Sequence, residues 1–276
     1  MSTSAPAPHT PEQDYVAPEV VRATMGAYGK KKANLPARDT LVRGFMSGML
    51  LAFATSVAME VIAEGSLPWV GAFIFPLGFV ILILLGFELL TGNFALVPVA
   101  LMDRTVSFSK MMANWGLVFV ANLIGSLVYA VLFYAVMTKF GQVSAGPIGE
   151  VIAHKAESKT LAYQEVGTAA GVGTAFVKGI LCNWMVATGT IMALVARSVI
   201  GKLICMWLPV FAFFAMGFEH SVVNMFLIPA GIMFGNDIGW GDWLVWNQIT
   251  VTVGNAVGAF LLVALVMRVT YTRRAT

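Results

Sequence analysis

The sequence has little charge and almost no cysteine. Only 11% of its 276 residues are Asp, Glu, Lys or Arg, whereas an ordinary soluble domain carries about a quarter. The two cysteines, Cys182 and Cys205, both lie in apolar runs, and they imply neither a disulfide framework nor a metal site. The sequence also lacks a nucleotide-binding loop, a metal-ligand cluster and a catalytic triad. We therefore expect no enzymatic activity, no cofactor, no bound metal and no nucleic-acid partner.

Hydrophobic residues make up 58% of the chain, and the mean hydropathy is +0.81. The apolar runs are long and continuous, and helices satisfy every backbone group of such a run in lipid. This pattern predicts an all-α integral membrane protein that contacts the lipid bilayer. With about 20 residues needed for one crossing, we predict six transmembrane helices, at residues 43–63, 69–101, 111–137, 169–195, 203–234 and 244–268.

The placement of the 17 Lys and Arg residues predicts the orientation. Cytoplasmic segments of membrane proteins are enriched in these residues. With both ends inside, only Lys139, Lys155 and Lys159 lie outside, and Lys178 lies in a span. The cytoplasmic group is Arg22, Lys30, Lys31, Lys32, Arg38, Arg43, Arg104, Lys110, Arg197, Lys202, Arg268, Arg273 and Arg274. We therefore expect both termini to be cytoplasmic, in a cytoplasmic (inner) membrane.

The chain also divides into two similar halves. The motif Gly-Phe-Glu-x-x-x-x-Asn occurs at Gly86 and again at Gly217. Asn114 and Asn122 match Asn247 and Asn255 with the same spacing. Each half has three spans, an odd number, so the second copy is inserted upside down. This predicts an aquaporin-like inverted repeat (3+3) in which helices 2 and 5 are broken.

The predicted segments follow from these spans. Residues 1–30 are expected to be a flexible cytoplasmic tail, because they lack the apolar run of a cleaved signal. The first three-helix repeat covers residues 31–137, and an extracytoplasmic connection covers 138–168. The second repeat covers residues 169–268, and 269–276 form the cytoplasmic C-terminus.

The polar residues at the breaks predict a site for small anions. A half-helix that starts at a break directs its N-terminus toward the membrane centre, where it attracts negative charge. Thr91 and Ser221 are suited to cap these helix ends. His220 is the only histidine in a predicted span, and imidazole titrates near neutral pH. We predict that it hands a proton to a weak-acid anion; the alternative is a hydrogen-bonded core histidine.

Other residues near the breaks have two interpretations each. Glu88 and Glu219, with Asn93 and Asn224, are expected to support the breaks by hydrogen bonds. Asn183, Asn122 and Asn255 either line the path or hold helices together. Phe75, Phe79 and Phe213 either form a hydrophobic gate or pack the bundle.

The breaks and two further motifs carry a family resemblance. These are Lys-Lys-Ala-Asn from Lys31, Gly-Phe-Glu-Leu-Leu-Thr-Gly-Asn from Gly86, Lys-Gly-Ile-Leu-Cys-Asn from Lys178, and Gly-Phe-Glu-His-Ser from Gly217. In them the chain resembles the formate/nitrite transporter family over residues 30–268. The resemblance implies a homopentamer with one pore per subunit, which conducts small monovalent anions such as formate or nitrite.

The resemblance also implies roles for individual residues. It makes His220 the pore histidine, Thr91 the threonine that contacts it, and Asn183 a polar partner near the outer vestibule. The implied inner constriction is Phe75, Phe79 and Phe213, and the implied outer one is Leu89, Leu90 and Val186. The family usually has an anion-attracting lysine sixteen positions before the asparagine of span four, but Gly167 is found there. Lys159 or Lys178 is expected to replace it.

The leading hypothesis is therefore a channel for small weak-acid anions, passive or proton-linked. Hydrosulfide and short carboxylates such as acetate or lactate are alternatives to formate and nitrite, because their charge and size are close. An aquaporin-type channel for neutral solutes is a second class, although Asn-Pro-Ala is missing at both breaks. A membrane protein without transport activity is the third.

Overall fold

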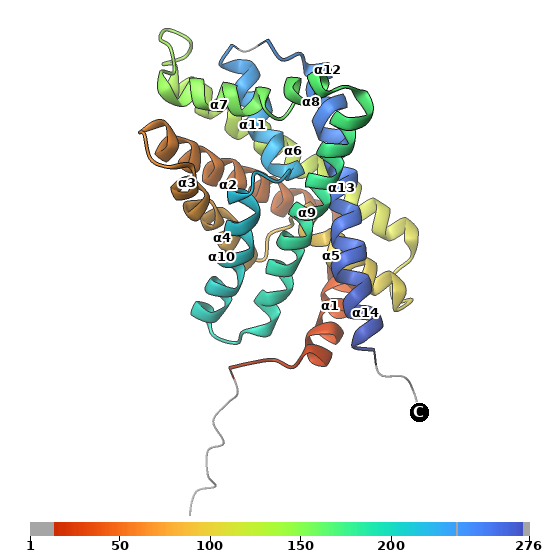
Figure 1. Cartoon of the computed structure of the whole chain (residues 1–276). Helices are drawn as coiled ribbons and strands as arrows, with labels where there is room; N and C mark the ends of the chain where they lie inside the picture. Colours follow the sequence, from red (N-terminus) through yellow and green to blue (C-terminus); the bar gives the residue numbers. More distant parts are fainter. Residues whose placement is uncertain (1–13, 236, 273–276) are drawn as a thin grey trace, which may run out of the picture.

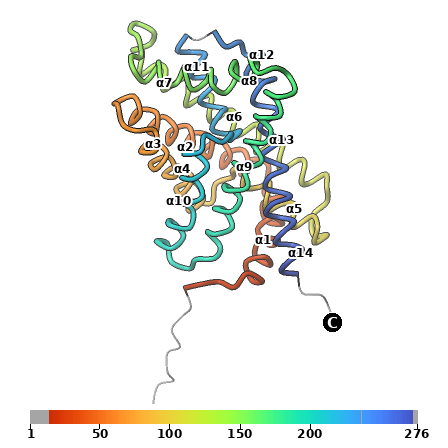
Figure 2. The backbone as a smooth tube through the Cα atoms, viewed as in Figure 1, coloured from red at the N-terminus to blue at the C-terminus, as the bar shows by residue number. Residues whose placement is uncertain are grey.

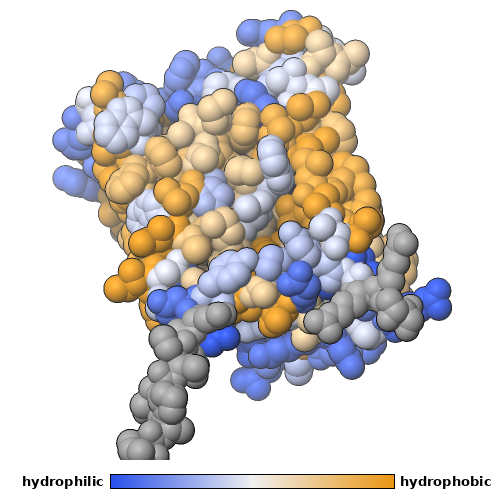
Figure 3. Space-filling model, turned by 60° about the horizontal axis from the view of Figure 1, so that its bottom comes forward, coloured by the Kyte–Doolittle hydropathy of each residue, from blue (hydrophilic) through white to orange (hydrophobic). Residues whose placement is uncertain are grey.

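The computed structural model describes residues 14–235 and 237–272, and their regular elements are helices (Figures 1 and 2). Four helices are long and apolar enough to cross a membrane. They are α2 (Ala37–Ala63), α6 (Phe108–Met137), α9 (Thr168–Val195) and a composite helix, Trp240–Thr270. The composite helix contains α12 (Trp240–Asp242), η1 (Trp243–Gln248), α13 (Ile249–Ala259), η2 (Phe260–Leu265) and α14 (Val266–Thr270). Apolar residues cover much of the molecule's flank (Figure 3). The chain is an integral membrane protein.

Shorter apolar helices connect these long ones. In the first half they are α3 (Pro68–Ile74), α4 (Pro76–Leu84) and α5 (Leu90–Met102). In the second half they are α10 (Val199–Ala215) and α11 (Ser221–Met233). The first turns of α5 and α11 are wholly buried, so these two helices begin inside the protein.

Close glycine contacts join the long helices in matching pairs. A Cβ atom on Gly125 of α6 would lie 2.0 Å from the carbonyl oxygen of Phe45 on α2. A Cβ on Gly258 of α13 would lie 2.3 Å from the carbonyl oxygen of Ile180 on α9. Neither position has room for a side chain, so the small residues bring the helices of each half together.

The chain leaves the helical conformation at two equivalent places. After α4, Gly86 has φ of +70°, and the Phe87 amide donates to the Leu82 carbonyl oxygen at 2.9 Å. After α10, Gly217 has φ of +63°, and the Phe218 amide donates to the Phe213 carbonyl oxygen at 3.1 Å. A glycine with positive φ and this hydrogen bond end a helix as a Schellman motif.

The first interruption lies earlier than the sequence indicated. The expected position was residues 91–93, but these residues form the first turn of α5, and the interruption covers residues 85–89. The second interruption covers residues 216–220, so Ser221 is already helical. In both places the glycine, and not the polar cluster after it, ends the preceding helix.

The predicted flexible tail is wrong for residues 18–30, and residues 1–13 lie outside the described residues. Residues 18–30 belong to helix α1 (Pro18–Ala33), which packs on α5. Val21 and Met25 are buried there, and a Cβ on Gly29 would lie 2.1 Å from the Leu96 carbonyl oxygen. Arg22 also pairs with Asp103 after α5. The helix is too polar overall to stand out from the sequence, because only one narrow face is apolar.

The two ends of the described chain lie at the same end of the molecule, beside α1 and α14 (Figure 1). The connection between the two halves lies at the opposite end. It contains α7 (Pro147–Glu157) and the short helix α8 (Leu161–Val166). We call the first the α1 end and the second the α7 end.

Candidate pore and its two mouths

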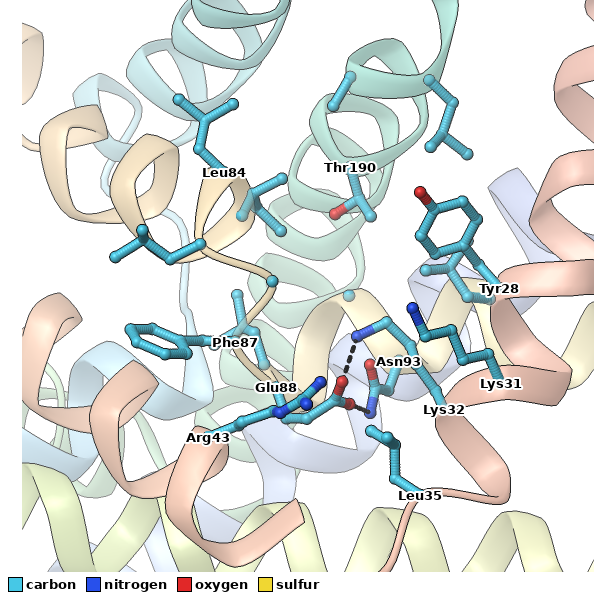
Figure 4. A pocket seen from close by; sticks show the side chains of 18 of the residues that line it. Tyr28, Lys31, Lys32, Leu35, Arg43, Leu84, Phe87, Glu88, Asn93 and Thr190 are labelled. Atoms are coloured by element: carbon cyan, nitrogen blue, oxygen red, sulfur yellow. Dashed lines mark hydrogen bonds and ion pairs between the residues drawn. The ribbon is translucent and has the colours of Figure 1, made fainter. Parts of the chain in front are cut away.

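A carboxylate network holds the first interruption. Glu88 is 2% exposed, and its Oε1 accepts from Lys32 Nζ at 2.8 Å. Its Oε2 accepts from Asn93 Nδ2 at 2.8 Å (Figure 4). The same amide donates to Asn114 Oδ1 at 3.0 Å. Asn114 Nδ2 closes the ring by donating to the Lys32 carbonyl oxygen at 3.1 Å. The lysine thus neutralises a buried charge whose oxygens are hydrogen-bonded.

The same network recurs at the second interruption. Glu219 is 1% exposed, and its Oε2 accepts from Lys159 Nζ at 3.0 Å and from Asn224 Nδ2 at 2.7 Å. Asn224 also donates to Asn247 Oδ1 at 2.8 Å, and Asn247 Nδ2 donates to the Lys159 carbonyl oxygen at 2.9 Å. Lys159 therefore occupies the place that Lys32 has in the first half.

Two asparagines satisfy the backbone that the interruptions leave free. Asn122 Nδ2 donates to the Glu88 carbonyl oxygen at 3.0 Å, and its Oδ1 accepts from the Leu90 amide at 3.0 Å. Asn255 does the same for Glu219 and Ser221, at 2.8 and 2.9 Å. Of their two interpretations, the contacts favour holding helices together over lining a path, because Asn122 also donates to the Gly44 carbonyl oxygen on α2 and Asn255 to that of Gly179 on α9.

His220 lies at the centre, next to Thr91. Its Nδ1 accepts from the Val223 amide at 3.2 Å, and its Nε2 lies 3.0 Å from Thr91 Oγ1. An Nδ1 that accepts a hydrogen bond cannot carry the proton, so the neutral ring is protonated on Nε2 and donates to Thr91. Phe213 covers the imidazole, with ring centroids 5.6 Å apart.

The helix caps differ from those predicted. The side chain that caps α11 is His220, through its bond from Val223. Ser221 Oγ is buried and has no hydrogen-bond partner in the described residues. At α5 the N-cap residue, Leu89, makes no side-chain cap, the Leu90 amide is bound by Asn122 instead, and Thr91 is a helical residue. Thr91 therefore does not cap a helix as the break pattern predicted, but it lies in contact with His220, as the family resemblance implies.

Asn183 also lies in this centre. Its Nδ2 donates to the Thr91 carbonyl oxygen at 3.2 Å and to the Asn255 carbonyl oxygen at 2.7 Å. Its Oδ1 is buried without a hydrogen-bond partner in the described residues. The residue was expected near the outer vestibule, but it is fully buried beside Thr91 and lines neither of the two cavities described next.

A cavity opens on each side of this centre. The cavity at the α1 end has a volume of about 510 Å³, and Lys31, Lys32, Arg43 and Lys202 are among its lining residues (Figure 4). The cavity at the α7 end has a volume of about 290 Å³, and it is lined by His220 together with Lys155, Lys159 and Lys178. Each cavity has one carboxylate among its lining residues, so both have an excess of positive charge.

The predicted constriction residues are buried, and the two sets lie toward different cavities. Phe213 lines the cavity at the α7 end, and its ring lies 5.8 Å from that of Phe75. Leu89 lines the cavity at the α1 end. The Lys and Arg distribution predicts that the α1 end is cytoplasmic; in that orientation Phe213 lies on the outer side and Leu89 on the inner side, opposite to what the resemblance implies. The other members, Phe79, Leu90 and Val186, are also buried.

Tyr163, which the sequence did not single out, binds the second network. Its hydroxyl donates to Glu219 Oε1 at 2.7 Å, and Lys178 Nζ lies 5.4 Å from its ring centroid. Burial, and then the charge of Glu219, raises the pKa of Tyr163. Burial and the neighbouring Lys159 lower the pKa of Lys155 on α7. No sequence pattern marks Tyr163, because its partner is 56 residues away.

The fold and this site define a membrane transport protein: two basic cavities meet at a buried centre formed by two similar halves. Comparison with known proteins identifies the family. The family described as "Formate/nitrite transporter" matches residues 19–269. The chain therefore belongs to the formate/nitrite transporter family, whose members are transporters and channels, and it is not an enzyme.

Relatives along the whole chain agree with this. A "Probable formate transporter" of Methanothermobacter thermautotrophicus is 34% identical over 260 residues, covering 89% of this chain and 93% of its own. "Formate channel FocA" of Haemophilus influenzae is 32% identical over 273 residues, covering 87% of this chain and 91% of its own. A solved "Pentameric formate channel with formate bound" has the same fold, with a TM-score of 0.71 and 24% identity over 86% of this chain and 98% of its own.

Proposed function

We propose that the chain is a channel for small monovalent weak-acid anions and that formate is its first substrate. The observation that carries this proposal is the pair of basic cavities on the two sides of the His220–Thr91 contact. Lysines attract an anion to each mouth, and buried apolar residues such as Phe213 and Leu89 exclude hydrated ions. The names of the relatives support formate.

We further propose six spans and an inverted repeat. The helices α3 to α5 form one broken span, and α10 and α11 form the other, which adds two spans to the four long helices. The repeats cover residues 31–137 and 169–268. Both termini, including residues 269–276, are cytoplasmic, the connection 138–168 is extracytoplasmic, and the membrane is the cytoplasmic one. The matched carboxylate networks support the repeat, and the Lys and Arg distribution supports the orientation.

His220 is the proposed proton donor, and its hydrogen bonds set a condition on the transfer. To protonate an anion and return to neutral, the ring must first carry protons on both nitrogens. A protonated Nδ1 cannot accept from the Val223 amide. Proton transfer by His220 therefore requires that the hydrogen bond from the Val223 amide to Nδ1, which caps α11, be broken first. The unpartnered Asn183 Oδ1 offers an acceptor for the hydroxyl of the neutral acid formed.

Nitrite has the same charge as formate and a similar size, so the proposed channel conducts nitrite as well. Hydrosulfide, acetate and lactate are the alternative anions, and the aquaporin-type channel is the alternative class. The fold of the solved pentameric channel supports a homopentamer with one pore per protomer. Native mass spectrometry of the purified protein tests this state, and a stable monomer or dimer would exclude it.

The test is anion uptake into liposomes loaded with a pH-sensitive dye. Formate, nitrite, hydrosulfide, acetate and chloride are each added outside, for the wild type and for His220→Asn. Proton-coupled entry of formate or nitrite that the variant loses supports the proposal. If chloride enters at the same rate as formate, and neither anion brings a proton with it, His220 has only a structural role. Osmotic swelling without anion flux supports the neutral-solute channel instead.

A further inference from the structure

The two carboxylate networks differ in one feature. In the first network each oxygen of Glu88 has one donor: Lys32 on Oε1, at 2.8 Å, and Asn93 on Oε2. In the second network the Tyr163 hydroxyl donates to Glu219 Oε1 at 2.7 Å, and Lys159 Nζ donates to Glu219 Oε2 at 3.0 Å. It shares that oxygen with two amides, Asn224 Nδ2 at 2.7 Å and Asn247 Nδ2 at 3.2 Å. The two lysine side chains are about equally exposed, at 16% and 14%.

From this difference we infer that Tyr163 is a positioning residue for anion capture at the α7 end. The inference rests on the proposed function and concerns the same channel. A carboxylate oxygen offers about two lone-pair sites, so a lysine that shares one oxygen with two amide donors makes a weaker ion pair than a lysine with an oxygen of its own. Lys159 therefore keeps more of its charge for an anion in the cavity that it lines than Lys32 does.

The ring of Tyr163 acts on a second lysine. Lys178 Nζ lies 5.4 Å from the ring centroid, within the range of a cation–π contact. Lys178 and Lys159 both line the cavity at the α7 end, whereas Tyr163 is 5% exposed and does not line it. One buried side chain thus orients two cavity lysines, through its hydroxyl group and its face.

The fold holds Tyr163 firmly in this place. It lies on α8, which packs against the start of α9. A Cβ on Gly171 of α9 would lie 1.9 Å from the Tyr163 carbonyl oxygen, so the two helices touch through backbone. Helix α8 lies in the stretch between Lys159 and Asn183, in which the sequence departs from the lysine spacing usual in the family.

Tyr163→Phe separates the two contributions, because it removes the hydroxyl and keeps the ring. Without the hydroxyl, Lys159 can bind both oxygens of Glu219, and the carboxylate then neutralises more of the positive charge that Lys159 presents to the cavity. We expect the half-saturating formate concentration from the α7 side to rise about three- to tenfold, the scale of one hydrogen bond. The maximal rate and the half-saturating concentration from the α1 side are expected to stay unchanged.

The measurement compares uptake into intact cells, which samples the α7 side, with uptake into inverted membrane vesicles, which samples the α1 side. Tyr134→Phe is the matched control, because Tyr134 packs on Phe234 away from the network. A half-saturating concentration does not depend on how much protein folds, so a lower yield of Tyr163→Phe does not affect the result. If no folded variant is recovered, Lys178→Met replaces it and should give a rise on the α7 side alone.

The outcomes are distinct. A rise on the α7 side alone supports the inference. No change, an equal change on both sides, or a loss of maximal rate with unchanged half-saturation overturns it and leaves the proposed function standing. A wild type that conducts neither formate nor nitrite overturns the proposed function together with the inference.

Discussion

The buried carboxylates Glu88 and Glu219 are the residues on which we expect stability to depend most. Each is at most 2% exposed and is paired with one lysine. Removing the carboxylate leaves its lysine, whose side chain is only 16% or 14% exposed, without a counter-charge, at a cost of up to about 3–5 kcal/mol. We therefore expect Glu88→Ala and Glu219→Ala to melt at clearly lower temperature, measured as loss of the oligomer by size-exclusion chromatography after heating in detergent.

Asp39→Ala is the control for these variants. Asp39 pairs with Arg43 at 3.8 Å, and both side chains are more than a third exposed. Exposed ion pairs contribute little to stability, so this variant should melt close to the wild type. The double variant Glu88→Met with Lys32→Met should recover much of the loss, because it leaves no unpaired charge. Equal melting of Glu88→Ala and Asp39→Ala would refute the argument.

The sequence could identify these carboxylates and their asparagine partners, Asn93 and Asn224, but not the lysines and the tyrosine that bind them. The repeated Gly-Phe-Glu motif marks Glu88 and Glu219 because both copies keep the same spacing. Lys32 and Tyr163 are 56 positions from the carboxylates that they bind, and no local pattern extends over that distance. His220 was predicted as a pore residue from its place in a span, but its role as a helix cap required the backbone position of Val223.

At the scale of elements, Gly86 and Gly217 end the helices before the two interruptions. A Cβ would meet no atom within 4 Å at either position, so the cost of alanine there arises only from the positive φ. That cost is about 1–2 kcal/mol. We expect Gly86→Ala and Gly217→Ala to lower the melting temperature and the transport rate together, because the carboxylate follows each glycine by two residues.

Gly116→Ala is the matched control. Gly116 lies inside α6, also with no atom within 4 Å of a Cβ, and its φ is not positive. Alanine favours a helix over glycine by about 1 kcal/mol, so this variant should be as stable as the wild type or more stable. If all three variants behave alike, the positive φ is not what shapes the interruptions.

The position of the elements was predicted better for the long helices than for the rest. The predicted bounds of the third and fourth spans lie within a few residues of the ends of α6 and α9, because hydropathy alone determines where these helices begin and end. The first interruption was placed at residues 91–93 because polar residues stand there, whereas the backbone turns at Gly86. Helix α1 was missed because its buried face consists of a few residues such as Val21 and Met25.

At the scale of the whole molecule, the inverted repeat makes a prediction about sidedness. Phe108 and Trp240 stand at corresponding places, each the first residue of the helix that follows a broken span, and both are exposed. An inverted repeat places them on opposite sides of the membrane. In a Cys205→Ser background, Phe108→Cys should react with an impermeant maleimide only in inverted vesicles. Trp240→Cys should react only in intact cells.

The control for this labelling is the wild-type cysteine that remains. Cys182 is fully buried, so the Cys205→Ser background should stay unlabelled from both sides. Labelling of both introduced cysteines from the same side would exclude the inverted repeat. A second possible result is that Phe108→Cys reacts only in intact cells and Trp240→Cys only in inverted vesicles, which would reverse the proposed orientation and keep the repeat. The second result would also return the phenylalanine constriction to the cytoplasmic side, where the sequence had placed it. The Lys and Arg distribution favours the expected orientation, with Phe108 on the cytoplasmic side and with Lys159 and Tyr163 on the outer side.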